Sequence, residues 1–220
     1  RDSSVTGVQT CALPIYGEIT AAIPTVVPPV GVVSSSLTSR SRKLTESPHH
    51  PMIGSIIGDI AGSTYEFTGN KDIGVPLFPP GSCFTDDTVM LVATADALMN
   101  GMDFRATYRS YGARFPAPMG GYGSRFRVWL TSEDNAPYGS WGNGAAMRVS
   151  PVGWAFNSLE ETTRCAEESA AVTHNHPEGI KGATATAGAI WLARTGASKA
   201  DIRSWVVSTY AYDLDRTCDE

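Results

Sequence analysis

The residues best suited to chemistry are three consecutive oxygen-bearing side chains, Thr85, Asp86 and Asp87. They stand where a helix is expected to begin, so their side chains would diverge around its first turn. From there they could bind one or two divalent cations, because Mg²⁺ and Mn²⁺ prefer oxygen ligands. The alternative is helix capping, since an acid near a helix N-terminus is stabilising. Two adjacent acids repel each other, however, and capping requires only one.

A second pair of acids lies in the apolar, glycine-bearing segment 52–67. Asp59 follows Gly58, and Glu66 comes four residues after Gly62. An acid that is buried in such a segment needs a partner, and a metal-bound water or a substrate hydroxyl would be suitable. Alternatively, Glu66 lies just past the end of a helix and points to solvent.

Asn143 lies between Gly142 and Gly144, at the start of a short predicted helix that leads to Arg148. Glycine permits close backbone approach, and a helix N-terminus offers free N–H groups to a phosphate. Arg148 could pair with a phosphate or with a nearby carboxylate. A plain turn with a structural arginine is the alternative.

Two histidines, His174 and His176, lie between two predicted helices. A zinc site here would be incomplete, because no cysteine or third histidine is near in the sequence. We predict that His174 contacts a ligand and that His176 is a structural loop residue.

Helices are expected to position these residues, because helix signals dominate the sequence from Met52 onward. The expected helix starts are Thr85, Asp103, Ser158, Pro177 and Ser198. Period-2 alternation is scarce, which predicts an all-α fold, a compact multi-helix bundle. Segment 116–141 is too long for an ordinary connection, and we interpret it as an irregular, functional loop.

Composition narrows the class of protein. A chain of 220 residues suits one domain or at most two small ones, and its net charge of −5 argues against nucleic acid as a partner. The four cysteines lie far apart and predict no disulfide framework, so a reducing cytoplasm is the expected location. No segment is apolar and long enough to predict a membrane span. We expect a monomer.

Four segments in this order carry a resemblance to a known family. They are Gly58-Asp59 with Gly62 and Glu66, then Phe84 to Thr88, then Gly142-Asn143-Gly144 with Met147-Arg148, and finally Thr173-His174 with His176. Over residues 52–220 the sequence resembles the ADP-ribosylglycohydrolase family, which includes the dinitrogenase-reductase-activating glycohydrolase and the ADP-ribosyl-acceptor hydrolases. The resemblance implies an all-helical enzyme that binds two Mg²⁺ or Mn²⁺ ions and hydrolyses the glycosidic bond between ADP-ribose and an acceptor.

The resemblance also implies a role for each matching residue. The metal ligands would be Thr85, Asp86 and Asp87, and the proton-handling residues would be Glu66 or Asp87 with a metal-bound water. The residues that would line the ADP-ribose pocket are Gly142, Asn143, Gly144, Arg148 and His174. The implied partner is an ADP-ribosylated protein or a small-molecule ADP-ribose conjugate. The acceptor stays open among arginine, serine, a nucleic-acid end and a small acylated group.

Two further functions remain open at this point. The first is an ADP-ribose-binding relative without turnover, because family resemblance indicates ancestry more securely than activity. The second is a Mg²⁺-dependent phosphohydrolase that uses the same acids on a pyrophosphate bond. Intact Glu66, Thr85, Asp86 and Asp87 favour an enzyme over a relative without turnover.

Both ends of the chain depart from the family. We expect residues 1–51 to be a non-native or disordered leader, with 1–15 resembling a translated sequencing adapter; a genuine flexible tail is the alternative. The family's second metal cluster, Asp-x-Asp-Thr after glycines, has no match. Asp213 and Asp215 lack the glycines, and Arg216 precedes Thr217. We therefore expect domain 52–220 to be C-terminally truncated, and the 220-residue chain to bind metal weakly and to be inactive by itself.

Overall fold

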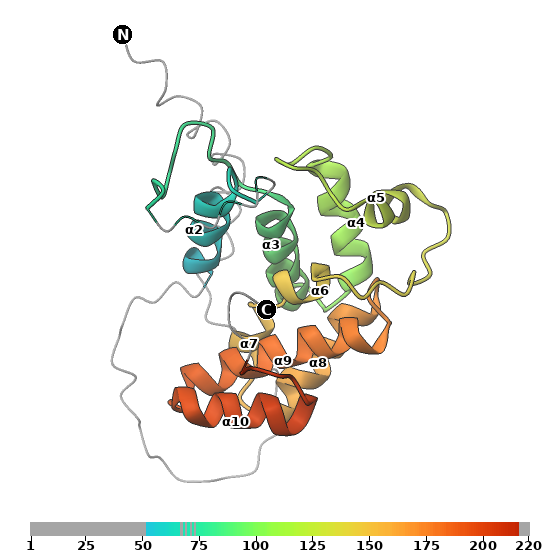
Figure 1. Ribbon diagram of the computed structural model, residues 1–220. Coiled ribbons are helices and arrows are strands. Elements are labelled where there is room, and N and C mark those ends of the chain that lie inside the picture. The colour runs from blue at the N-terminus through green and yellow to red at the C-terminus, as the bar shows by residue number, and fades with distance from the viewer. Residues whose placement is uncertain (1–51, 67, 69, 71, 73, 216–220) are drawn as a thin grey trace, which may run out of the picture.

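Helices are the regular elements of this protein, as its computed structural model shows (Figure 1). The structure describes residues 52–66, 68, 70, 72 and 74–215, so the predicted leader 1–51 lies outside the described residues. The helices are α2 (Ile53–Gly62), α3 (Asp86–Met99), α4 (Phe104–Arg114), α5 (Ser124–Thr131), α6 (Gly144–Met147), α7 (Val152–Ala155), α8 (Leu159–Ala171), α9 (Pro177–Arg194) and α10 (Lys199–Tyr210). The described residues contain no β-strand, only an isolated bridge between Thr85 and Met119. The all-α prediction is confirmed.

The predicted helix starts are confirmed because each cap is local in sequence. The side chains of Thr85, Asp103 and Ser158 accept backbone N–H groups at the starts of α3, α4 and α8. Pro177 occupies the first turn of α9, and Ser198 begins α10 with a capping box.

The prediction that segment 116–141 is irregular throughout is wrong, because α5 lies within it. This helix forms through tertiary packing. Phe126 and Trp129 are buried on one of its faces, with their rings stacked at a centroid distance of 5.4 Å. Arg109 of α4 donates to the carbonyls of Trp129 and Ser132 at 2.6 and 2.8 Å, which satisfies the end of the helix. The short helix α7 was likewise not predicted.

Helix α9 is the centre of one half of the molecule, where it packs against α6, α7, α8 and α10. Its small residues permit this packing. A Cβ atom added at Gly188 would lie 2.1 Å from the ring of Trp205 on α10. In the other half, α3 packs against α2 and α4 (Figure 1). None of the described helices is long and apolar enough to cross a membrane.

Candidate functional site

The carboxylate of Asp59 on α2 holds the start of α3. Its Oδ1 accepts from the Thr85 hydroxyl at 2.6 Å, and its Oδ2 accepts from the Thr85 amide at 2.9 Å. Oδ2 also accepts from the amide of Thr88 at 3.2 Å and from its hydroxyl at 2.5 Å. Both threonines are buried. We call this arrangement the Asp59 clamp, and it fixes the first turn of α3 against α2.

Asp86 and Asp87 occupy the turn that the clamp fixes, and both are half-buried. Burial, then repulsion from Asp87 and Glu66, raises the pKa of Asp86 to about 7. Burial, then the charges of Asp59 and Glu66, raises the pKa of Asp87 to about 6. These carboxylates therefore oppose one another's ionisation near neutral pH.

The first of two hollows lies between α2 and the start of α3, with a volume of about 470 Å³. Its lining includes Asp59, Tyr65, Glu66, Asp87, Thr88 and Met147. Glu66 follows the end of α2 and is exposed, as one of the two interpretations of the sequence expected. The structure thus brings Glu66 and Asp87, the two predicted proton-handling residues, to the same hollow.

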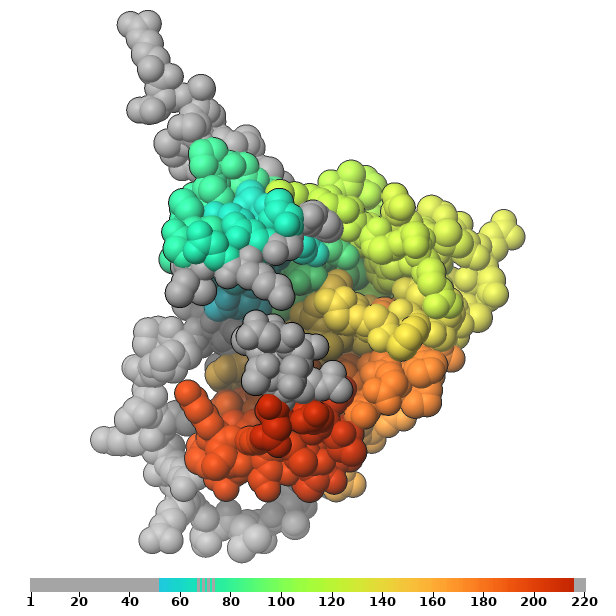
Figure 2. All heavy atoms as spheres, in the orientation of Figure 1, coloured from blue at the N-terminus to red at the C-terminus, as the bar shows by residue number. Residues whose placement is uncertain are grey.

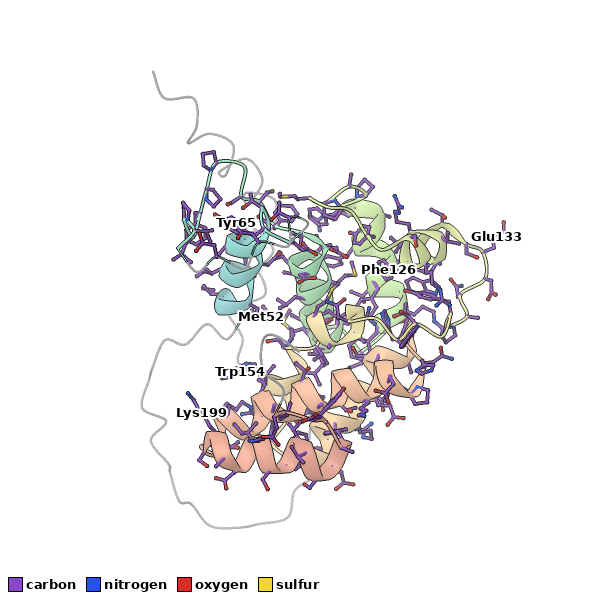
Figure 3. All side chains as sticks on the ribbon, viewed as in Figure 1. Met52, Tyr65, Phe126, Glu133, Trp154 and Lys199 are labelled. Atoms are coloured by element: carbon purple, nitrogen blue, oxygen red, sulfur yellow. The ribbon has the colours of Figure 1, made fainter. Side chains whose placement is uncertain are left out.

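The second hollow, of about 250 Å³, lies on the other side of α3. Its lining includes Asp86, Arg125, Phe126, Tyr138, Asn143, Gly144, Met147, Arg148 and His174. Met147 lines both hollows, so they are neighbours. In Figure 3, the labelled Tyr65 of the first hollow and Phe126 of the second lie on either side of α3. Figure 2 shows α3 set back between the cyan segment around α2 and the yellow-green segment after α4.

Four of the five predicted substrate-binding residues meet in the second hollow. These are Asn143, Gly144, Arg148 and His174, whereas Gly142 is exposed and lines neither hollow. Segment 116–141 contributes Arg125 and Tyr138 to the same wall.

Arg148 is a cation that is only 1% exposed. Its Nη2 donates to the Ser169 carbonyl at 3.0 Å and to the Thr173 hydroxyl at 2.9 Å, and its guanidinium lies over the Tyr108 ring at 4.3 Å. Within the described part of the chain, no carboxylate pairs with it and its Nε has no hydrogen-bond partner. A buried charge without an opposite charge is costly, so this arginine keeps the surrounding wall electropositive.

His174 lies beside Arg148 and is 5% exposed. Burial, followed by the charges of Arg148 and Arg125, lowers the pKa of its imidazole to about 4, so the ring is neutral near pH 7. Gly144 permits its position, because a Cβ atom added there would lie 2.9 Å from Nε2. His176 differs: its Nδ1 accepts the Glu178 amide at 3.1 Å and caps α9, which is the structural role predicted for it.

Comparison with known proteins decides the family. The sequence profile of the ADP-ribosylglycohydrolase family matches residues 49–219, well over half of the chain. The chain belongs to this family. It is 29% identical to ADP-ribosylhydrolase ARH3 of Bos taurus and of Homo sapiens, and 28% identical to that of Mus musculus. Each of these alignments covers 68% of this chain and 50% of the relative, so the chain spans about half the length of these relatives.

The turn 85–87 of this ADP-ribosylglycohydrolase domain offers the oxygen donors that a hard divalent cation prefers. Thr85, Asp86 and Asp87 are oxygen donors, and a cation would relieve the repulsion that raises the two aspartate pKa values. The described residues include no group of three or more His, Cys, Asp or Glu side chains placed to hold a metal ion. Asp87 and Asp86 instead line different hollows.

The sequence did not reveal how two residues, Asp59 and Thr173, organise this site. Asp59 was noted as an acid that needs a partner, and its partners prove to be two threonines of the Thr85–Thr88 turn. Thr173 was noted only as part of a motif, yet its hydroxyl lies between Arg148 and His174. The pairing of Arg148 with Thr173 spans 25 residues, so no local pattern could have shown it.

Proposed function

We propose that this domain takes part in hydrolysis of the glycosidic bond between ADP-ribose and an acceptor, in a protein that depends on Mg²⁺ or Mn²⁺. One observation carries the proposal. The first hollow, which Glu66 and Asp87 line, adjoins the second hollow, which Asn143, Arg148 and His174 line. We call them the acidic hollow and the electropositive hollow. Family membership and the name ADP-ribosylhydrolase ARH3 of three relatives support it.

The electropositive hollow suits the ADP-ribose part of a substrate. Arg125 and Arg148 give its wall two positive charges, which favour a diphosphate. Neutral His174 supplies a hydrogen-bonding nitrogen, and Asn143 an amide at the start of α6. The predicted contacts of these residues with the nucleotide belong to this proposal. Gly142 precedes Asn143 as part of the exposed chain that leads to the hollow, not as part of its lining.

The acidic hollow suits the reacting end of the same substrate. Thr85, Asp86 and Asp87, which share the turn beside this hollow, would hold the cation, and the cation would supply a Lewis acid to polarise a water or orient ribose hydroxyls. Glu66 is exposed at the rim, where its carboxylate could exchange a proton with the acceptor or with a water. Asp87 lines the same hollow, where its carboxylate could accept a proton from a water.

The test incubates the protein with ADP-ribosylated arginine and serine peptides, with Mg²⁺ or with a chelator. Because the chain spans about half the length of the relatives it matches, it is assayed both alone and within any longer form of the protein. Release of free ADP-ribose only with Mg²⁺ supports the proposal. Binding without product would indicate a non-catalytic relative, and release of AMP would indicate a phosphohydrolase.

Matched variants link the activity to the site. Glu66→Gln and Asp87→Asn are expected to lower turnover by at least about 100-fold, the scale of lost general acid–base catalysis. Glu160→Gln on α8 makes the same chemical change at an exposed position outside both hollows and serves as the control. Equal turnover in all three variants would refute the assignment.

A further inference from the structure

The two ring nitrogens of His174 have different surroundings. Nδ1 lies 2.7 Å from the hydroxyl oxygen of Thr173, within hydrogen-bond distance. Nε2 has no hydrogen-bond partner among the described residues, and it lies on the side of the ring that faces Gly144. Both His174 and Gly144 line the second hollow. The position of the imidazole proton therefore decides whether this nitrogen offers a donor or an acceptor.

The Thr173 hydroxyl is fully buried and receives a hydrogen bond that cannot be reversed. Arg148 donates to it at 2.9 Å, and a guanidinium has no lone pair with which to accept. The proton of the hydroxyl is then left to be placed, and its remaining neighbour within hydrogen-bond distance among the described residues is Nδ1 of His174.

The burial of the Thr173 hydroxyl decides where its proton goes. A buried hydroxyl proton without an acceptor is costly, and among the described residues Nδ1 of His174 is the acceptor within hydrogen-bond distance. Thr173 therefore donates to Nδ1 of His174, which places the proton of the neutral imidazole on Nε2. In the opposite arrangement, Thr173 would accept from both Arg148 and the imidazole, and its own buried proton would have no acceptor among the described residues.

We propose that Thr173, oriented by Arg148, is a positioning residue that keeps the His174 ring protonated on Nε2. The second hollow then presents a hydrogen-bond donor, which selects a ligand group that accepts. A phosphate, ribose or adenine atom of ADP-ribose with a free lone pair meets this requirement, and this choice of ligand rests on the proposed function. Besides the positive charge that it gives the wall, Arg148 acts here through its hydrogen bond to Thr173.

The direct test is ¹⁵N NMR of the histidine side chains of the full chain near neutral pH. Loss of one signal set in His174→Gln assigns His174. We expect the wild-type spectrum to show Nε2 as the protonated nitrogen and Nδ1 as the unprotonated one. Thr173→Ser keeps the hydroxyl and should preserve this spectrum. Thr173→Val removes the hydroxyl and should shift the ring toward a mixture of tautomers.

Binding of ADP-ribose, measured by calorimetry, supplies the second arm. Thr173→Val should weaken binding about tenfold, the scale of one hydrogen bond, while Thr173→Ser stays within about twofold of wild type. A wild-type His174 protonated on Nδ1 overturns the proposal, as does an unchanged tautomer in Thr173→Val. Because the wild-type spectrum is decisive alone, a misfolded valine variant does not remove the test. If the tautomers behave as expected but ADP-ribose does not bind, the positioning role stands and the proposed function fails.

Discussion

Replacing Asp59 by asparagine should reverse the direction of one hydrogen bond, so that the Thr85 hydroxyl accepts instead of donates, while the shape of the Asp59 clamp is kept. An asparagine with its carbonyl oxygen in the Oδ2 position keeps three bonds, and its NH₂ group faces the Thr85 hydroxyl. That hydroxyl already accepts the Asp87 amide at 3.2 Å. A second accepted bond occupies both of its lone pairs, so Thr85 has none left for a cation.

The two substitutions at Asp59 should therefore separate folding from metal binding. Asp59→Asn replaces a charge-assisted bond by a neutral one, which lowers the free energy of unfolding by about 1 kcal/mol. The Mn²⁺ affinity should fall by about 10–100-fold, as is typical when a residue that orients a metal ligand is changed. Asp59→Ala leaves four donors without their acceptor and should cost at least about 3 kcal/mol of stability.

The assay pairs urea unfolding without metal with Mn²⁺ titration followed by electron paramagnetic resonance, which measures weak binding. Asp134→Asn is the matched control. Asp134 is exposed, and within the described part of the chain its side chain accepts the Ala136 amide at 2.9 Å and no other donor, which an asparagine can also do. The reasoning is refuted if folded Asp59→Asn binds Mn²⁺ as tightly as the wild type and the control do.

Three further outcomes follow from the packing and the charges. Gly144→Ala places a Cβ atom 2.9 Å from Nε2 of His174, so calorimetry should show ADP-ribose binding weakened by about tenfold. The Cβ atom added in Gly188→Ala would lie 2.1 Å from the Trp205 ring, so this variant should lower the free energy of unfolding by about 1–3 kcal/mol. Gly182→Ala is its control and should not lower it, because the nearest atom to the added Cβ is 3.8 Å away. The folded His174 has a pKa of about 4, below the ordinary value of 6.5, so between these pH values the unfolded state binds more protons than the folded state. The free energy of unfolding of the wild type, measured relative to that of His174→Gln, should therefore fall by up to about 3 kcal/mol as the pH drops from 6.5 to 4. Above pH 6.5 this difference should be constant; a rise in relative stability on acidification would contradict the assignment of a depressed pKa.

How much the sequence could predict depended on the distance along the chain between interacting residues. The start of α3 was predictable because Thr85 caps it by accepting from Asp87, two residues away. The Asp59 clamp was not, because its partners lie 26 and 29 residues further along the chain. The helix α5 was missed for the same reason, since the burial of Phe126 and Trp129 against other elements stabilises it.

The position of α3 between the two hollows has an energetic consequence. Asp87 lines the acidic hollow and Asp86 lines the electropositive one, and these adjacent residues share the turn that the Asp59 clamp fixes. A cation bound at this turn would lower the negative potential that an anionic ligand meets at Asp86. The two ligands should therefore bind cooperatively, and linkage requires each to raise the affinity of the other by the same factor. We expect about 5–10-fold, a coupling of roughly 1 kcal/mol. Calorimetry of ADP-ribose with and without Mn²⁺, and of Mn²⁺ with and without ADP-ribose, measures both factors; independent binding would show that the clamped turn does not connect the two hollows.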